Sequence, residues 1–299
     1  MALPPLAPEP ESPAAVDGPT LPDVPSATEP VQRATAAVAG AAAEAAAGVA
    51  GAAADSAGRA VAGATQAAAE GTVSAPVAIA RGRTAMVVAL AGLIGFGAIF
   101  AAVRAHRSEA IDLALMLRLQ RQRRPWLDRL MAAASWPGFP PQSHVIPPAA
   151  IAGMWLVRFR TEAAFQTAGW GAAALSTVLK ALMNRPRPVA GTDLRVVVAP
   201  LGGSSFPSGH VITFVGTYGF MAYLAHTLIR DPALRWAAAG GLVGLVVLVG
   251  PSRIYQGHHW PTDVTASYLL GTTYLIVVVT AYRRVKGAQT TTGLGDLHR

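Results

Sequence analysis

Long apolar segments alternate with short polar stretches from residue 84 onward. A helix that crosses a membrane needs about 20 consecutive, mainly apolar residues. Five segments fit this length, and a sixth at 146–157 is shorter and carries two prolines near its start, where they suit a first helical turn. The five are 84–104, 163–183, 211–229, 234–251 and 264–282. The pattern therefore predicts an all-α bundle of six transmembrane helices, with both termini on one side of the membrane.

Residues 109–131 show a different pattern, in which apolar positions give way to arginines. A segment of this kind lies among the lipid headgroups instead of crossing the bilayer. We therefore expect an interfacial helix here, with the arginines of 118–129 facing headgroups. The loops on the opposite side are also basic, while 104–130 alone carries seven arginines. The positive-inside rule therefore does not settle which side faces the cytoplasm.

The first 80 residues differ from the rest of the chain. Residues 1–32 are rich in Pro, Glu, Asp and Ser and lack the basic start and apolar stretch of a cleavable signal peptide. Residues 33–80 are mostly Ala and Gly, whose small side chains bury little area. We expect a disordered tail over 1–80, with a helix that binds the membrane surface or a partner as the alternative. A membrane domain over 81–287 and a C-terminal tail over 288–299 follow.

Composition supports a membrane class, since 52% of residues are hydrophobic and 13% are charged. The net charge of +8 is divided unevenly, with −6 on residues 1–80 and +14 on residues 81–299. A basic, apolar domain suits anionic lipids or phosphates. Nucleic acid is not an expected partner, because the bases are scattered between apolar runs. The absence of cysteine excludes disulfides, thiolate catalysis and Cys-ligated zinc.

Three polar islands interrupt the apolar runs. They are "KALMNRPRP" (180–188), "FPSGH" (206–210) and "SRIYQGHHWPTD" (252–263). Charged groups beside a membrane-spanning segment are costly and usually mark function. The first two islands lie between the third and fourth predicted spans, and the third lies between the fifth and sixth. Alternating spans place these two loops on the same membrane face, so all three islands can form one site.

The islands contain the groups needed to bind a phosphate. Lys180, Arg187 and Arg253 supply three positive charges, and arginine matches phosphate oxygens in bidentate fashion. Pro207 fits the first turn of the fourth span, which would leave backbone amides free as anion donors. These amides belong to Ser208, Gly209 and His210.

The same islands contain a nucleophile and an acid. His259 and Asp263 are four residues apart, which is one helical turn. The aspartate can accept the Nδ1 hydrogen and leave Nε2 free as a nucleophile. His210, on another helix, can then act as the general acid.

The pattern K-x6-RP, PSGH, SR-x5-H-x3-D resembles the three signature motifs of the type 2 phosphatidic acid phosphatase superfamily, which includes vanadium haloperoxidases. It is met in full by the residues named above, with Pro188, Pro207 and Ser252 completing the motifs. The order and spacing of three motifs are specific, whereas PSGH alone would be weak. The resemblance covers about residues 84–285.

The resemblance implies a mechanism. His259 would attack phosphorus and form a phosphohistidine, Asp263 would fix its tautomer, and His210 would protonate the leaving group. The phosphoryl oxygens would be held by Lys180, Arg187, Arg253, Ser208 and Gly209. No metal or other cofactor would be needed. The six predicted spans favour a membrane lipid phosphatase, whose substrate would be a polyprenyl diphosphate, phosphatidic acid or phosphatidylglycerol phosphate. Its site would face the outer side of the cell membrane.

Other interpretations of the islands are weaker. His210, His258, His259 and Asp263 could bind a metal, but three nearby cations would repel it. A Ser208 nucleophile lacks the strand-to-helix turn that exposes such a serine. A transporter or non-catalytic protein that binds lipid phosphates remains the second hypothesis, and it would release no phosphate.

Several residues have no assigned role or an open one. We expect His258 to be an incidental polar neighbour of the site. Arg185 is left open between a second phosphate or headgroup contact and an interfacial anchor. The histidines that match no motif are His106, His144, His226 and His298.

Overall fold

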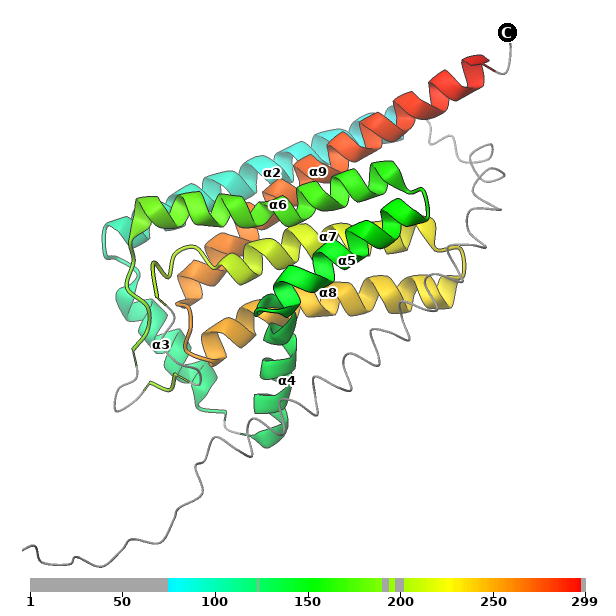
Figure 1. The fold of residues 1–299 in the computed structure, drawn as a ribbon. Helices are drawn as coiled ribbons and strands as arrows, with labels where there is room; N and C mark the ends of the chain where they lie inside the picture. Colours follow the sequence, from blue (N-terminus) through cyan, green and yellow to red (C-terminus); the bar gives the residue numbers. More distant parts are fainter. Residues whose placement is uncertain (1–74, 123, 190–193, 197–201, 297–299) are drawn as a thin grey trace, which may run out of the picture.

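The computed structural model describes residues 75–122, 124–189, 194–196 and 202–296, and every regular element within them is a helix. This confirms the all-α class. The helices that lie roughly side by side in Figure 1 are α2 (Ala75–Arg104), α5 (Gln142–Leu156), α6 (Arg160–Met183), α7 (Gly209–Leu228), α8 (Pro232–Tyr255) and α9 (Pro261–Asp296). Most of the expected tail lies outside the described residues. At the other end α9 continues beyond residue 287, where we expected the domain to stop.

Helix α7 forms the centre of the bundle and packs against α6, α8 and α9, while α2 packs along α9 (Figure 1). Half of the residues of α7 are buried, most of them apolar. Glycines allow the closest approach, between α6 and α7. A Cβ at Gly169 would lie 2.6 Å from the carbonyl oxygen of Gly216. Small residues bring helix backbones together in this way in membrane proteins.

The expected interfacial segment is two helices, α3 (Glu109–Gln120) and α4 (Pro125–Ser135). Both run across the direction of the long helices in Figure 1 and pack near the end of α8. A one-turn 3-10 helix, η1 (Trp136–Gly138), connects α4 toward α5. The pair α3–α4 therefore covers the end of the bundle where α8 stops and α9 begins.

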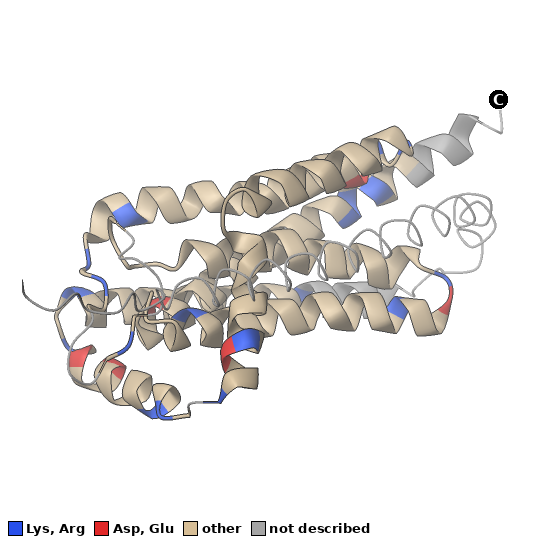
Figure 2. Cartoon of the chain, turned by 60° about the horizontal axis from the view of Figure 1, so that its bottom comes forward, with Lys and Arg blue, Asp and Glu red and all other residues tan. Residues whose placement is uncertain are grey.

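Four of the described helices are long and apolar enough to cross a membrane. They are Arg83–Arg104 of α2, Gly209–Leu228 (α7), Pro232–Tyr255 (α8) and Pro261–Gln289 of α9. Lys, Arg, Asp and Glu are largely confined to the ends of these helices, and their middle parts carry other residues (Figure 2). Helix α5 has only 15 residues, and α6 carries Arg160, Glu162 and Lys180. The count of six spans therefore stays a prediction.

Candidate active site

The three polar islands meet at one end of the bundle. The first begins in the last turn of α6 and continues beyond it, the second precedes and opens α7, and the third runs from the end of α8 into the start of α9. Arg187 of the first island donates from Nη1 to the carbonyl of His258 in the third island (2.9 Å) and from Nη2 to the carbonyl of Ser204, two residues before the second island (3.3 Å). The convergence expected from alternating spans is therefore present.

His259 is buried, with 2% of its surface exposed, and it precedes α9 instead of lying on it. Its Nδ1 lies 2.7 Å from the backbone carbonyl of Ser205. A carbonyl oxygen can only accept, so Nδ1 carries the hydrogen and Nε2 keeps its lone pair. Burial and the charges of nearby arginines lower the pKa of His259 well below its ordinary value. The ring is therefore a neutral base whose Nε2 carries a lone pair and accepts from Arg187 Nη1 at 3.4 Å.

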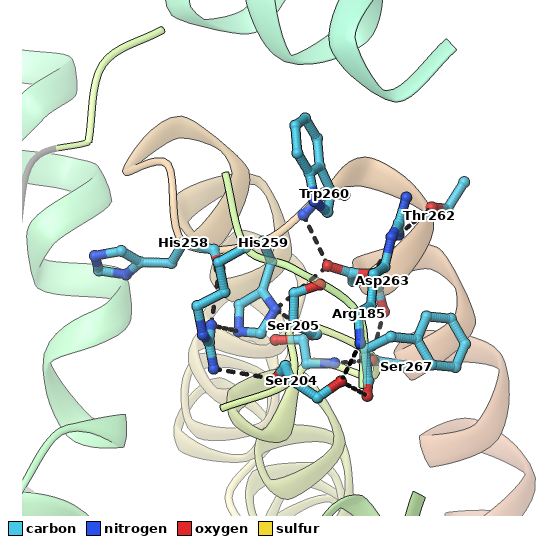
Figure 3. A network of polar contacts seen from close by, with 12 residues as sticks. Arg185, Ser204, Ser205, His258, His259, Trp260, Thr262, Asp263 and Ser267 are labelled. Atoms are coloured by element: carbon cyan, nitrogen blue, oxygen red, sulfur yellow. Dashed lines mark hydrogen bonds and ion pairs between the residues drawn. The ribbon is translucent and has the colours of Figure 1, made fainter. Parts of the chain in front are cut away.

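Asp263 lies in the first turn of α9 and is fully buried. One oxygen, Oδ2, accepts the backbone N–H of Trp260 (2.9 Å), as an acidic residue does in a helix-capping box. The same oxygen lies 3.6 Å from Nδ1 of His259. The expected hydrogen bond from His259 to Asp263 is thus replaced by the one to Ser205, although the carboxylate remains next to the ring (Figure 3).

Arg253 is the most deeply buried cation of the site, with 0% exposure. Its Nη1 donates to Gln256 (3.1 Å), and its guanidinium carbon lies 4.8 Å from the centre of the Phe139 ring. Its Nε and Nη2 have no hydrogen-bond partner among the described residues. Buried arginine N–H groups without a partner are costly, so this side of the guanidinium is suited to receive an anion.

The other two cations, Arg187 and Lys180, lie close to His259 and to the start of α7, respectively. Arg187 Nη1 lies 3.4 Å from Nε2 of His259. Lys180 reaches the start of α7, since a Cβ at Gly209 would lie 3.6 Å from its Nζ. Among the described residues, the ion pairs of this end of the bundle involve other arginines, and neither Lys180, Arg187 nor Arg253 is paired to a carboxylate. Cations without a carboxylate partner of their own therefore lie beside His259.

The start of α7 differs in detail from the expectation. Pro207 precedes the helix, which begins at Gly209 with Ser208 as N-cap residue. The amide of Ser208 donates to Ser267 (2.7 Å), so it is not free for an anion. The side-chain Oγ of Ser208 is buried without a partner in the described structure. Ser208 can therefore contribute its hydroxyl where we expected its amide.

His210 extends from the second position of α7 toward η1. Its Nε2 is buried without a partner among the described residues, and the ring packs edge-on against Phe139, with centroids 4.9 Å apart. The backbone at Gly138 comes so close that an added Cβ would lie 2.8 Å from Nε2. The sequence did not predict that residues 136–139 ("WPGF") pack against His210, because this segment carries no side chain with catalytic chemistry.

His258 is not a surface residue, since only 2% of it is exposed. Its ring points away from His259 (Figure 3), and both ring nitrogens lack a described partner. The helical geometry that we expected to separate the two histidines is absent, because residues 256–260 form a turn around Gly257, whose φ is +79°. Burial and the charge of Arg253 lower the pKa of His258 to about 3.

Arg185 has partners that neither of its two open interpretations included. Its guanidinium is paired with Asp112 of α3 (2.6 Å) and Asp263 (2.5 Å), and its side chain is 9% exposed. The R-P-R-P sequence was the only signal of this residue, and it could not reveal the partner on α3. Among the described residues no three His, Asp or Glu side chains are grouped as metal ligands. The metal-free mechanism stays a prediction.

Comparisons with known proteins agree with the motifs. The model of the PAP2 superfamily matches residues 163–286, which include all three islands. The chain is 30% identical over 178 residues to phosphatidylglycerophosphatase B of Bacillus subtilis (strain 168), covering 57% of this chain and 83% of that protein. It is 33% identical over 85 residues to undecaprenyl-diphosphatase BcrC of the same organism, covering 28% and 39%.

A solved structure has a similar fold. The crystal structure of the first transmembrane PAP2 type phosphatidylglycerolphosphate phosphatase from Bacillus subtilis matches with a TM-score of 0.58 at 25% identity, covering 66% of this chain and 96% of that one. The chain belongs to the PAP2 superfamily. It is a membrane phosphatase, a hydrolase that acts on phosphate esters.

Proposed function

We propose that this protein hydrolyses a lipid phosphate monoester or diphosphate through a phosphohistidine at His259. The observation that carries the proposal is the pair of buried, unpartnered N–H groups of Arg253. They accompany the unpartnered Ser208 Oγ and His210 Nε2 in the same site. A phosphoryl group would supply acceptors for all of these groups together.

The chemistry follows from the positions of the groups. Nε2 of His259 attacks phosphorus, the bond between phosphorus and the leaving oxygen breaks, and His210 transfers a proton to that oxygen. Lys180, Arg187 and Arg253 stabilise the charge on the equatorial oxygens, as preorganised cations do in phosphoryl transfer. Water then attacks the phosphohistidine after giving a proton to His210, which releases phosphate and restores both histidines.

The names of the relatives support a lipid substrate. One relative is a phosphatidylglycerophosphatase and another an undecaprenyl-diphosphatase. The candidate substrates are therefore phosphatidylglycerol phosphate, polyprenyl diphosphates such as undecaprenyl diphosphate, and phosphatidic acid. The groups described above recognise the phosphoryl group, which all three share. We place the protein in the cell membrane with the site on its outer face.

A phosphate-release panel over these three lipids tests the proposal. The purified protein should release phosphate from at least one lipid, with excess EDTA present, and should be inhibited by vanadate, which mimics five-coordinate phosphorus. Quenching with an alkaline denaturant during turnover should trap a phosphoenzyme that is stable in base and labile in acid. Absence of release from every lipid phosphate, or loss of activity to EDTA with recovery on adding zinc or magnesium, would contradict this mechanism.

A further inference from the structure

Arg185 lies on the Nδ1 side of His259, the proposed nucleophile, and its side chain has no hydrogen bond to any of the described residues that would hold phosphate. Its Nη1 donates to Asp263 Oδ1 (2.5 Å) and to the hydroxyl of Thr262 (2.9 Å). Its Nη2 donates to Asp112 Oδ2 (2.6 Å) and to the hydroxyl of Ser108 (3.1 Å). Both Nη atoms of Arg185 therefore donate to acceptors at the start of α3 and in the first turn of α9, whereas Nη2 of Arg253 has no partner among the described residues.

The backbone of Arg185 is hydrogen-bonded to the segment that contains Ser204 and Ser205. Its N–H donates to the hydroxyl of Ser204 (3.0 Å), and its carbonyl accepts the N–H of Ser205 (2.8 Å). Ser205 also donates from its hydroxyl to the carbonyl of Pro186 (3.1 Å). These bonds fix the segment whose carbonyl accepts the Nδ1 hydrogen of His259.

Asp112 completes the arrangement from α3. It is fully buried, and besides Arg185 it accepts the N–H (2.8 Å) and the hydroxyl (2.7 Å) of Thr262. A buried carboxylate and a buried guanidinium are stable together only when both are fully hydrogen-bonded. The first turn of α9, which carries Asp263, is thereby attached to α3.

We propose that Arg185 is a positioning residue of the hydrolysis. It fixes both acceptors beside Nδ1 of His259, the Ser205 carbonyl and the Asp263 carboxylate (Figure 3). Through Asp112 it also attaches them to α3. This role rests on the proposed function of His259 as nucleophile. Arg185 acts through other residues and not on the phosphoryl group itself.

The test separates positioning from binding. Arg185→Lys keeps the positive charge but loses the planar guanidinium that bridges the carboxylates of Asp263 and Asp112. Asp112→Asn keeps the shape of the side chain but removes the negative charge that pairs with Arg185. A misplacement of about 1 Å at a reacting group can cost about 10²-fold in rate. We expect both variants to form phosphoenzyme about 10²-fold more slowly in single turnover, while vanadate inhibits them at concentrations within about threefold of wild type.

A matched control exists in the same chain. Arg195 forms another arginine–aspartate bridge among the described residues, with Asp128 at 2.8 Å, and its guanidinium lies over the ring of Tyr255. Arg195→Lys should leave the rate of phosphoenzyme formation within about threefold. The thermal midpoints of both variants show whether each is folded. If Arg185→Lys is not folded, Asp112→Asn alone provides the test.

The outcomes are distinct. Vanadate affinity that falls in parallel with rate would make Arg185 a phosphate ligand, and unchanged rates would make it a passive support; either result overturns the proposal. In the Asp263→Asn background, Arg185→Lys should cost less than in wild type, because part of its action passes through that carboxylate, whereas equal costs contradict this. Failure to trap any phosphoenzyme from wild type would instead refute the proposed function.

Discussion

At the scale of single residues, the adjacent histidines 258 and 259 have different environments. His259 has its Nδ1 bonded to Ser205 and its Nε2 beside Arg187, whereas the ring of His258 points away. We expect His259→Ala to abolish turnover and phosphoenzyme. His258→Ala should stay within about tenfold, or about 1.4 kcal/mol at the barrier. Single-turnover kinetics on both purified variants measures this, and a dead His258→Ala beside an active His259→Ala that still traps phosphate would reverse the assignment.

Asp263 gives a second residue-scale prediction. In a serine protease triad, loss of the aspartate charge costs about 10⁴-fold because the histidine takes the wrong tautomer. Here the Ser205 carbonyl keeps the Nδ1 hydrogen in place without the carboxylate. Asp263→Asn should therefore be severely impaired but by less, about 10²-fold in single-turnover rate. A loss of about 10⁴-fold would show that Asp263, and not Ser205, sets the tautomer in the reacting enzyme.

His210 should matter most for poor leaving groups. An alkoxide needs a proton to leave, whereas phosphate released from a diphosphate leaves readily without one. General acid catalysis contributes about 10²–10⁴-fold. We expect His210→Ala to slow phosphoenzyme formation from a lipid monophosphate far more than from a lipid diphosphate. Equal losses on the two substrates, with chemistry rate-limiting, would remove His210 from this role.

The residue scale also shows what the sequence can predict about the site. Side-chain chemistry is visible in motifs, so the cations and histidines were predicted as a group that the fold then brings together. The carbonyl of Ser205 could not be predicted, because every residue has one and its use depends on chain geometry. The pairing of Arg185 with Asp112 joins residues 73 positions apart, a distance that no local pattern spans.

At the scale of elements, the contact between α6 and α7 positions the site, because Lys180 lies in the last turn of α6 and His210 in the first turn of α7. Gly169→Ala would place a Cβ 2.6 Å from the Gly216 carbonyl oxygen. Overpacking of this kind costs about 1–3 kcal/mol, and we expect a lower thermal midpoint and lower activity. Gly244→Ala, in α8 with nothing within 4 Å of the added Cβ, is the control and should match wild type. Equal midpoints for both variants would contradict a close α6–α7 contact.

Elements also differ in how well periodicity predicts them. Strongly apolar segments correspond to α2, α7, α8 and α9, because a lipid-facing helix is apolar over most of its surface. The segment 109–131 was predicted as one helix and is two, since Pro125 begins α4. The relation between His259 and Asp263 was treated as one helical turn, but Pro261 begins α9 only after His259.

At the scale of the whole molecule, the described structure concentrates the proposed chemistry at one end, so its orientation decides which lipids reach it. The chain has no cysteine, which permits labelling of single introduced cysteines. Arg121 is exposed after α3 at the site end, and Arg230 is exposed between α7 and α8 at the opposite end. If the site faces outward, a membrane-impermeant maleimide should label Arg121→Cys in intact expressing cells and label Arg230→Cys only after permeabilisation. Labelling of both variants in lysed cells controls for reactivity, and the reverse pattern in intact cells would place the site on the cytoplasmic face.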